Sequence, residues 1–222
     1  MAFDTALSGC QVALQRSEGD IFSKQVETQK EQARLLVPMV QEIIAEARLT
    51  FQDIDVIGVT NGPGSFTGLR LGLSTARSFG LALNKPVIGV NCFDFMLAHY
   101  RAQGVSGRVL VLLETKRRDF YAQSFDSQDE PLTPMMAVES EKILEFIDDD
   151  IKIAGDCLER FRAESDLADH WFLENVSQPD PKLLLNLISK RSDPIDSGRV
   201  GPIYLRGADI SQPKVPPRKL AD

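Results

Sequence analysis

The chain has 222 residues, a formal net charge of −7 and a hydrophobic fraction of 43%. This length is enough for one large domain or for two smaller lobes that each bury a core. The acidic balance, with no basic block longer than Lys116-Arg117-Arg118, disfavours direct RNA binding by the chain alone, because a protein that binds RNA by itself usually has a basic stripe.

The cysteines and the apolar runs indicate where the protein works. Cys10, Cys92 and Cys157 are an odd number and have no CxxC spacing, which suits a reducing compartment and buried, small apolar side chains. No apolar run reaches the length of a membrane span, and no basic flank precedes an apolar signal core at the N-terminus. We therefore expect a cytoplasmic protein with no membrane partner.

The first half of the chain is predicted to alternate strands with helices. Residues 29–47 carry apolar side chains at i, i+3, i+4 spacing, which predicts a helix that kinks or restarts at Pro38. A helix rich in small residues is predicted directly after the strand at 55–60 and its Gly-rich turn, and residues 93–103 are predicted to form a further short helix. The predicted strands are short and comprise residues 2–5, 11–15, 19–26, 55–60 and 87–90.

The second half repeats this plan. Strands at 109–114 and 120–125 are expected to form a hairpin, and a third strand is expected at 151–154. The predicted helices comprise residues 140–147, 157–164 and 181–190. On this pattern alone the fold class is α/β with mixed sheets.

We place three parts along the chain from these elements. Residues 1–103 are predicted to form an N-terminal α/β lobe that carries the partner-binding helices, and residues 104–206 a C-terminal α/β lobe. Residues 207–222 contain three prolines and are expected to form a flexible tail, because proline cannot continue regular structure.

The most informative segment is VTNGPGSFTGLRLGLSTARSFGLAL, residues 59–83. A β-branched strand ends here at a Gly-rich turn, residues 61–64, and a helix begins near Ser65 to Thr67. Many α/β proteins use this order to place backbone N–H groups against an anion. A tight strand-to-helix connection with Ser65 or Thr67 as the N-cap is the simpler alternative.

The helix of this segment has small residues at every fourth position. They form a stripe without side-chain bulk along one face and comprise Gly68, Gly72, Ala76 and Gly80. Each helical Gly costs roughly 1 kcal/mol relative to Ala. We therefore expect an offsetting gain, such as close packing of the helix backbone against another helix.

Two nucleotide-binding motifs are excluded by the residues at this turn. A Walker A loop ends in Gly-Lys-Ser/Thr, whereas this turn leads into Gly68-Leu69-Arg70. A dinucleotide fingerprint needs a third Gly three residues after Gly64, and Thr67 stands there.

Hydrolytic chemistry has no support in the sequence. His99 and His170 are far apart, with neither HExxH nor HxxxH spacing, so a metalloprotease site is not indicated. Ser65 is not in a Gly-x-Ser-x-Gly elbow, and no histidine is near Cys92 in the sequence. We predict no catalytic residue and no metal site.

NGPGSFTGLRLGLSTARSFGLAL, residues 61–83, resembles the signature of the TsaB (YeaZ) family, in which GPGSFTGLR precedes a Gly/Ala-rich helix. Upstream, AFDTALSGCQVAL and ARLLVPMVQEIIAEARLTFQDID resemble the family's opening strand-turn-strand and its first long helix. The resemblance covers essentially the whole chain, and weaker landmarks follow at residues 109–126, 153–157 and 202–206.

The resemblance implies an actin-like/Hsp70-like ATPase fold, which is ribonuclease H-like, with two tandem mixed-sheet α/β lobes. It implies an accessory, non-catalytic subunit required for N6-threonylcarbamoyladenosine (t6A) formation at position 37 of tRNAs reading ANN codons. Such a subunit dimerises with the related catalytic subunit TsaD and activates it, and it helps to form a surface for the ATPase TsaE. A homodimer is the alternative pairing.

The resemblance also implies where cofactors and tRNA bind. ATP and a metal are expected in the partner subunits and not on this chain alone, and tRNA is expected to bind only through the complex.

Family members pair through the first long helix, predicted at residues 29–47, and the small-residue helix that follows Ser65. The resemblance therefore assigns a partner interface to these two helices. The competing interpretation is that both helices pack only on their own sheet. The assigned residues are Arg34, Leu35, Pro38, Met39 and Glu42 on the first helix, and Leu69, Arg70, Gly72, Leu73, Ala76, Arg77 and Gly80 on the second.

A vestigial phosphate site is the last expectation. In active members of the superfamily, a strand-end Asp and the following turn approach the phosphates of a magnesium nucleotide. The turn here lacks Lys or Arg, so Asp4 is expected rather to accept turn N–H bonds. The residues of this expected site are Asp4, Thr5, Gly62, Gly64 and Ser65.

Two other functions compete with the accessory subunit. One is a stand-alone actin-like ATPase or sugar-kinase-like phosphotransferase that uses Asp4, Thr5 and the 62–67 loop. The other is a self-paired scaffold without a connection to tRNA.

Overall fold

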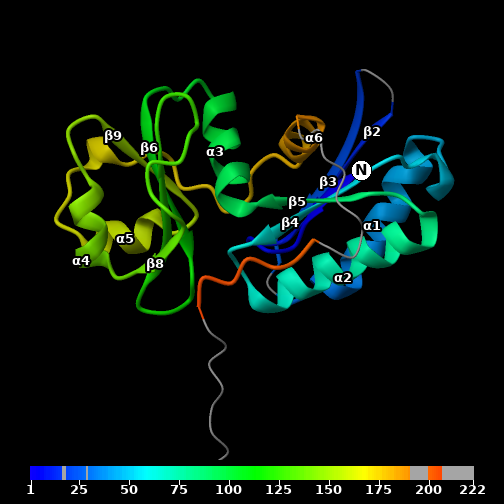
Figure 1. The fold of residues 1–222 in the computed structure, drawn as a ribbon, viewed down its shortest axis with the longest axis horizontal. Coiled ribbons are helices and arrows are strands. Elements are labelled where there is room, and N and C mark those ends of the chain that lie inside the picture. Colours follow the sequence, from blue (N-terminus) through cyan, green and yellow to red (C-terminus); the bar gives the residue numbers. More distant parts are fainter. Residues whose placement is uncertain (17–18, 29, 191–199, 207–222) are drawn as a thin grey trace, which may run out of the picture.

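The computed structural model describes residues 1–16, 19–28, 30–190 and 200–206, which form two β-sheets with helices around them (Figure 1). The first sheet has the strand order β3-β2-β1-β4-β5. β1, β2 and β3 pair antiparallel, whereas β1, β4 and β5 pair parallel. The bounds are Ala2–Asp4 (β1), Cys10–Arg16 (β2), Asp20–Val26 (β3), Ile57–Gly62 (β4) and Val87–Asn91 (β5).

The second sheet repeats this arrangement with fewer strands. Its order is β8-β7-β6-β9, with β6 and β7 antiparallel and β6 and β9 parallel. A hairpin therefore lies next to a parallel strand in both sheets, as the repeated sequence pattern predicts. The bounds are Arg108–Glu114 (β6), Phe120–Phe125 (β7), Met136–Val138 (β8) and Ile151–Gly155 (β9).

Helices cover both faces of the first sheet. α1 (Gln32–Glu46) and α2 (Phe66–Leu83) lie side by side on one face, and α3 (Cys92–Ala102) and α6 (Lys182–Ser189) lie on the other (Figure 1). The faces follow from the apolar residues: Leu36, Val40 and Ile43 of α1 pack with Val12 of β2 in one cluster. α4 (Ser140–Ile143) and α5 (Leu158–Glu164) pack on the outer face of the second sheet.

The predicted elements differ from the observed ones in details. α1 begins at Gln32 rather than at residue 29 and continues through Pro38 without ending there. β8 was not predicted, because three half-buried residues give too short a pattern. The predicted helix at 140–147 consists of α4 followed by a 3₁₀ turn, Leu144–Phe146.

A shared apolar core joins the two lobes. Ile88 of the first sheet and Val109 and Leu113 of the second belong to one buried cluster around α3. Tyr100 of α3 reinforces it, because its hydroxyl donates to the carbonyl of Glu174 at 2.6 Å and accepts from the N–H of Gly155 at 3.0 Å. The lobes are therefore fixed to each other through this core.

The predicted lobe boundary at 104–206 is wrong at its C-terminal end. α6 packs on the first sheet, where Leu184, Leu185 and Ile188 are buried against it. Residues 200–206, here called the C-terminal segment, pass alongside α2, as the orange trace in Figure 1 shows. The chain therefore returns to the first lobe after residue 181, since the apolar face of α6 is covered there. The predicted tail, 207–222, lies outside the described residues.

The small-residue stripe of α2 faces the chain's own sheet. Gly68, Gly72, Ala76 and Gly80 are all buried. A Cβ atom on Gly68 would lie 1.8 Å from the carbonyl oxygen of Thr5, and one on Gly72 would lie 2.7 Å from Thr5 Oγ1. The close packing expected for this stripe therefore exists at Gly68 and Gly72, but it is against the end of β1 and not against another helix.

We predict that Gly68→Ala destabilises the protein although Ala is the better helix former. The added methyl group has no space beside the Thr5 carbonyl, so the free energy of unfolding should fall by about 2 kcal/mol, as in other overpacked cores. Urea denaturation measures this change. Ser74→Ala, on the exposed side of the same helix, is the control and should change it by less than about 0.5 kcal/mol. Equal stabilities for the two variants would contradict the packing role of Gly68.

Candidate functional site

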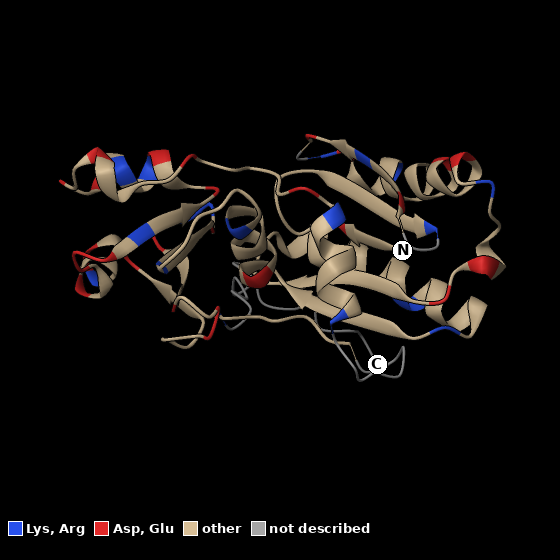
Figure 2. Ribbon diagram, turned by 90° about the horizontal axis from the view of Figure 1, so that it is seen from above, with Lys and Arg blue, Asp and Glu red and all other residues tan. Residues whose placement is uncertain are grey.

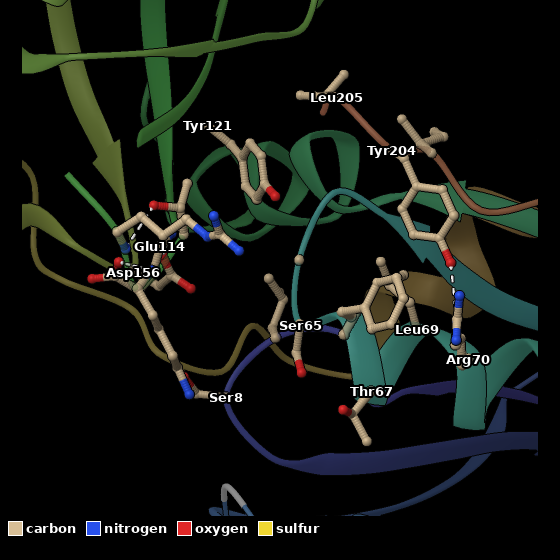
Figure 3. A pocket seen from close by; sticks show the side chains of 18 of the residues that line it. Ser8, Ser65, Thr67, Leu69, Arg70, Glu114, Tyr121, Asp156, Tyr204 and Leu205 are labelled. Carbon is tan, nitrogen blue, oxygen red and sulfur yellow. Dashed lines mark hydrogen bonds between the residues drawn. The ribbon is translucent and has the colours of Figure 1, made fainter. Parts of the chain in front are cut away.

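A cavity of about 480 Å³ lies where the two lobes meet. On the first lobe it is lined by residues 6–8 of the β1–β2 turn and by the start of α2. On the second lobe it is lined by residues 114–117, Tyr121 and Asp156, and residues 203–206 complete the wall. Figure 3 shows Glu114 and Asp156 on one side, and Ser65, Tyr204 and Arg70 on the other.

Asp4 is directed into the protein and does not line this cavity. Its carboxylate accepts hydrogen bonds from Thr60 Oγ1 at 2.5 Å, from the N–H of Ala6 at 2.9 Å, and from the N–H of Leu7 and Gln11 Nε2 at 3.4 Å. Burial raises the pKa of Asp4, while these bonds act in the opposite direction. Asp4 therefore orders the turn, as expected from its position at the strand end.

Of the other residues of the expected phosphate site, two are buried inside the first lobe and two line the cavity. Thr5 is buried and its hydroxyl donates to the carbonyl of Gly68 at 2.7 Å. Gly62 is also buried, at positive φ beside the carbonyl of Ile203. Only Gly64 and Ser65 line the cavity. The structure thus brings only two of the five predicted residues to the cavity, because the contacts of Asp4, Thr5 and Gly62 are made inside the chain.

Ser65 is the N-cap of α2, as one alternative predicted. Its Oγ accepts from the N–H of Gly68 at 3.3 Å, and its own N–H donates to the carbonyl of Ala6 at 2.8 Å. Gly64 lies against the same Ala6 carbonyl, where a Cβ would lie 2.5 Å from the oxygen. The turn before α2 and the β1–β2 turn are therefore in direct backbone contact.

The second lobe gives the cavity an acidic wall. Asp156 accepts a hydrogen bond from the N–H of Glu114 at 2.7 Å. Burial raises the pKa of Asp156 to about 7, and the nearby charge of Glu114 adds to this rise. Glu114 forms an ion pair with Arg160 at 3.4 Å. These two carboxyl groups can accept hydrogen bonds from amino groups of a ligand.

Cations gather at the edge of the same cavity. Lys116, Arg117, Arg118 and Arg206 are here called the basic rim; three of them line the cavity, and Arg118 lines an adjoining hollow with Arg117, Arg206 and the acidic residues Asp119 and Glu139. Arg206 forms an ion pair with Asp119. Burial lowers the pKa of Arg206, and so does the charge of Arg117, which lines the same cavity and the same hollow.

Neither a metal site nor a nucleophile is evident among the described residues. No three His, Cys, Asp or Glu side chains come together there to hold a metal ion. His99 accepts from the N–H of Asp180 at 3.2 Å. Burial raises the pKa of Cys92 well above its usual value, which disfavours the thiolate. In the part of the chain that the structure describes, no helix is long and apolar enough to cross a membrane.

The residues assigned to a partner interface fall into two groups. The exposed ones are Arg34, Pro38, Glu42, Arg70 and Arg77. Leu35 is half-buried, and those that are buried by the chain itself are Met39, Leu69, Gly72, Leu73, Ala76 and Gly80. The assignment is corrected for this second group, since a helix period identifies a face but not the side on which the sheet lies.

Both arginines of α2 contact the C-terminal segment. Arg77 Nε donates to the carbonyl of Val200 at 3.1 Å, and Arg70 Nε donates to the Tyr204 hydroxyl at 3.4 Å. The N–H of Ile203 also donates to the carbonyl of Asn61 at 2.7 Å. These contacts connect residues far apart in the sequence, and no local pattern could have predicted them.

The exposed side of α2 carries a second set of small residues. Ser74, Ser78 and Ala82 follow each other at four-residue spacing, and Leu81 beside them is 80% exposed. We call these four residues the outer ridge. Ser74 Oγ donates to the carbonyl of Leu71, and Ser78 Oγ to that of Ser74, so both hydroxyls are bonded within the helix. The same four-residue rule that found the glycine stripe could have found this ridge.

The chain is similar to proteins of one family by sequence. A family model described as "TsaD: tRNA N6-adenosine threonylcarbamoyltransferase" matches residues 21–163. The TsaB protein of Escherichia coli K12 is 31% identical over 121 residues, which are 54% of this chain and 52% of that protein. The TsaB protein of Buchnera aphidicola subsp. Baizongia pistaciae is 25% identical over 201 residues, 86% of this chain and 89% of that protein.

Coverage differs among these relatives. The match with TsaB of B. aphidicola subsp. Schizaphis graminum spans 57% of that protein, so the chain covers little more than half of some of the relatives it matches.

The fold is similar to that of a solved structure. "YeaZ from Pseudomonas aeruginosa" superposes with a TM-score of 0.81 at 25% identity and covers 92% of this chain and 98% of that one. This confirms the predicted two-lobe α/β fold of the ribonuclease H-like, actin-like class. The chain therefore belongs to the TsaD family, with the TsaB (YeaZ) proteins as the members that it resembles.

Proposed function

We propose that the chain is an accessory, non-catalytic subunit for the formation of N6-threonylcarbamoyladenosine in tRNAs that read ANN codons. The TsaB relatives are named "tRNA threonylcarbamoyladenosine biosynthesis protein", and this name motivates the proposal. The observation that carries the non-catalytic role is the state of Asp4. Its carboxylate is fully buried and bonded to Thr60, Gln11 and the turn, so it has no side open to a metal-bound nucleotide.

The proposed action is to dimerise with a TsaD-like catalytic subunit and to activate it. The outer ridge of α2 suits this contact, because small residues with satisfied hydroxyls let a partner helix approach closely and Leu81 can enter a partner pocket. α1 lies beside α2 and adds the exposed residues Arg34, Val37 and Pro38. Two adjacent helices with exposed faces can pack against two helices of a second subunit to form a bundle.

Further parts of the proposal concern partners and location. A TsaE-like ATPase binds the assembled pair, and a homodimer through the same ridge is the form of the chain without TsaD. ATP and a metal belong to the partner subunits, and the location is the cytoplasm. The competing ATPase function is disfavoured by the internal contacts of Asp4 and Thr5.

The first test is a drop-out reconstitution. Unmodified tRNA, threonine, bicarbonate, ATP, the adenylate synthase, TsaD and TsaE are combined with and without this chain, and modified adenosine is counted by mass spectrometry. We expect product only when the chain is present, because it activates the transferase. The Asp4→Asn variant, provided that it is folded, should support the same yield of modified adenosine as the unmodified chain, since Asp4 has no catalytic role. Equal product without the chain would refute the accessory function.

A second prediction concerns the outer ridge. Leu81→Asp should weaken pairing with TsaD by more than about tenfold, because a charge replaces an exposed apolar anchor. Size-exclusion chromatography with light scattering measures the pairing. The thermal midpoint of the isolated variant should be unchanged, since Leu81 is 80% exposed.

The control for this prediction is Leu132→Asp. Leu132 is also exposed, at 47%, but it lies in the second lobe near β7. It should leave pairing intact. Loss of pairing in both variants, or in neither, would disprove the ridge as the interface. Gly72→Leu and Ala76→Leu are unsuitable for this test, because both positions are buried against the sheet.

A further inference from the structure

The C-terminal segment, residues 200–206, has one buried end and one partly exposed end. Val200 is 3% exposed and belongs to the apolar cluster that α1 and α2 share with the first sheet. Its carbonyl accepts a hydrogen bond from Arg77 Nε at 3.1 Å. From Gly201 to Arg206 every residue is half-buried or exposed, and Tyr204 is 45% exposed. The segment is therefore held firmly at Val200 and less firmly beyond it.

The contacts beyond Val200 are mostly polar and lie near the surface of the first lobe. The N–H of Ile203 donates to the carbonyl of Asn61 at 2.7 Å, and Asn61 Nδ2 donates to the carbonyl of Gly201 at 3.2 Å. The Tyr204 ring lies 5.6 Å from the Phe66 ring, measured between centroids. Breaking these contacts leaves both sheets intact, so a local opening costs less free energy than unfolding of the whole chain.

An ion pair connects the end of the segment with the second lobe. Arg206 pairs with Asp119, whose side chain is 11% exposed and whose Oδ1 accepts from Thr115 Oγ1 at 3.0 Å. Figure 2 shows acidic and basic residues on both lobes, and within residues 104–181 the acidic ones outnumber the basic ones. The second lobe therefore attracts Arg206, although the charge of Arg117 acts against this attraction. Salt weakens such a contact by screening.

The same segment forms part of the wall of the inter-lobe cavity. Residues 203–206 line it together with Glu114, Asp156 and Tyr121 of the second lobe (Figure 3). Burial raises the pKa of Tyr121, whose side chain is half-buried there. Gly201, at the start of the less buried part, has open space around its Cβ position, and glycine has the widest choice of backbone conformations. A rotation at Gly201 can therefore move this wall without moving Val200.

We propose that residues 201–206 form a strap that opens at Gly201 and controls access to the inter-lobe cavity, with the ion pair of Arg206 and Asp119 as the contact that keeps it closed. This inference goes beyond the proposed function, in which the outer ridge of α2 pairs with TsaD. The strap and the outer ridge lie on different sides of α2, so the two claims can fail separately.

The first test is amide hydrogen exchange of the full chain, measured residue by residue by NMR. The reference is the amide of Gly58, which donates to the carbonyl of Met1 between β1 and β4. We expect the opening that exposes the Ile203 amide to be at least about 100-fold more populated than the opening at Gly58. Low urea should speed exchange at Gly58 but not at Ile203, because a local opening exposes little surface. Equal opening populations and urea dependences at the two amides would overturn the proposal.

Variants test what keeps the strap closed. Arg206→Gln removes the ion pair and should raise the exchange rate of Ile203 by at least about fivefold. Gly201→Ala should lower this rate by about two- to fivefold, because Ala restricts the open segment and meets no atom in the closed one. Arg108→Gln removes an ion pair with Asp148 elsewhere in the second lobe and is the matched control. Equal exchange rates in the two Arg→Gln variants would contradict the role of the Arg206 pair.

Nitration by tetranitromethane, followed by mass spectrometry, measures access to the cavity. Tyr121 should be nitrated at least about threefold faster in Arg206→Gln than in Arg108→Gln, because opening hydrates its hydroxyl and favours the reactive phenolate. Tyr100 is buried and should react in neither variant. Faster exchange at Ile203 with unchanged nitration of Tyr121 would show that the strap opens without controlling the cavity, and would overturn the proposal.

Two further variants distinguish the possible failures. Asp119→Asn breaks the same ion pair from the second lobe and should reproduce both effects of Arg206→Gln; unchanged exchange and nitration would contradict the proposal. Leu81→Asp should change neither reading while it loses TsaD pairing, which separates a failure here from a failure of the proposed function. Thermal midpoints show that each variant is folded.

Discussion

The approach of α2 to the end of β1 is the contact on which the rest of the structure depends. Gly64 and Gly68 let the backbone before and within α2 touch Ala6 and Thr5. Two hydrogen bonds fix this contact, from the Thr5 hydroxyl to the Gly68 carbonyl and from the Ser65 N–H to the Ala6 carbonyl. The start of α2 then forms one wall of the cavity, and the side of α2 that faces away from the sheet is exposed. Glycine is needed at Gly68 in spite of its low helix propensity, because no side chain fits between these two backbones.

The sequence was sufficient to predict most strands, the repeated sheet plan and an N-cap at Ser65 or Thr67, because these follow from local patterns; the structure selects Ser65. It was not sufficient to predict the direction of the small-residue stripe. Gly72 and Ala76 would show the same spacing whether a strand of the same chain or a partner helix approached them. Only the tertiary structure distinguishes the two, and it places the strand there.

The candidate site was harder to predict, because distant segments assemble it. Arg70, residues 116–118 and Arg206 meet only after the chain returns to the first lobe through α6 and the C-terminal segment. Net charge, which averages over all 222 residues, conceals such a cluster. The block at residues 116–118 was visible in the sequence, but its neighbours were not.

The two flanks of α2 explain how one helix can serve two surfaces. Arg70 and Arg77 bond to the C-terminal segment along one flank, which brings Tyr204 and Arg206 to the cavity. The outer ridge at Ser74 and Ser78 is not part of these contacts. A partner helix on the ridge therefore does not need to displace the C-terminal segment. Because α2 is packed against the end of β1, the outer ridge and the wall of the cavity that α2 forms are held at a fixed separation.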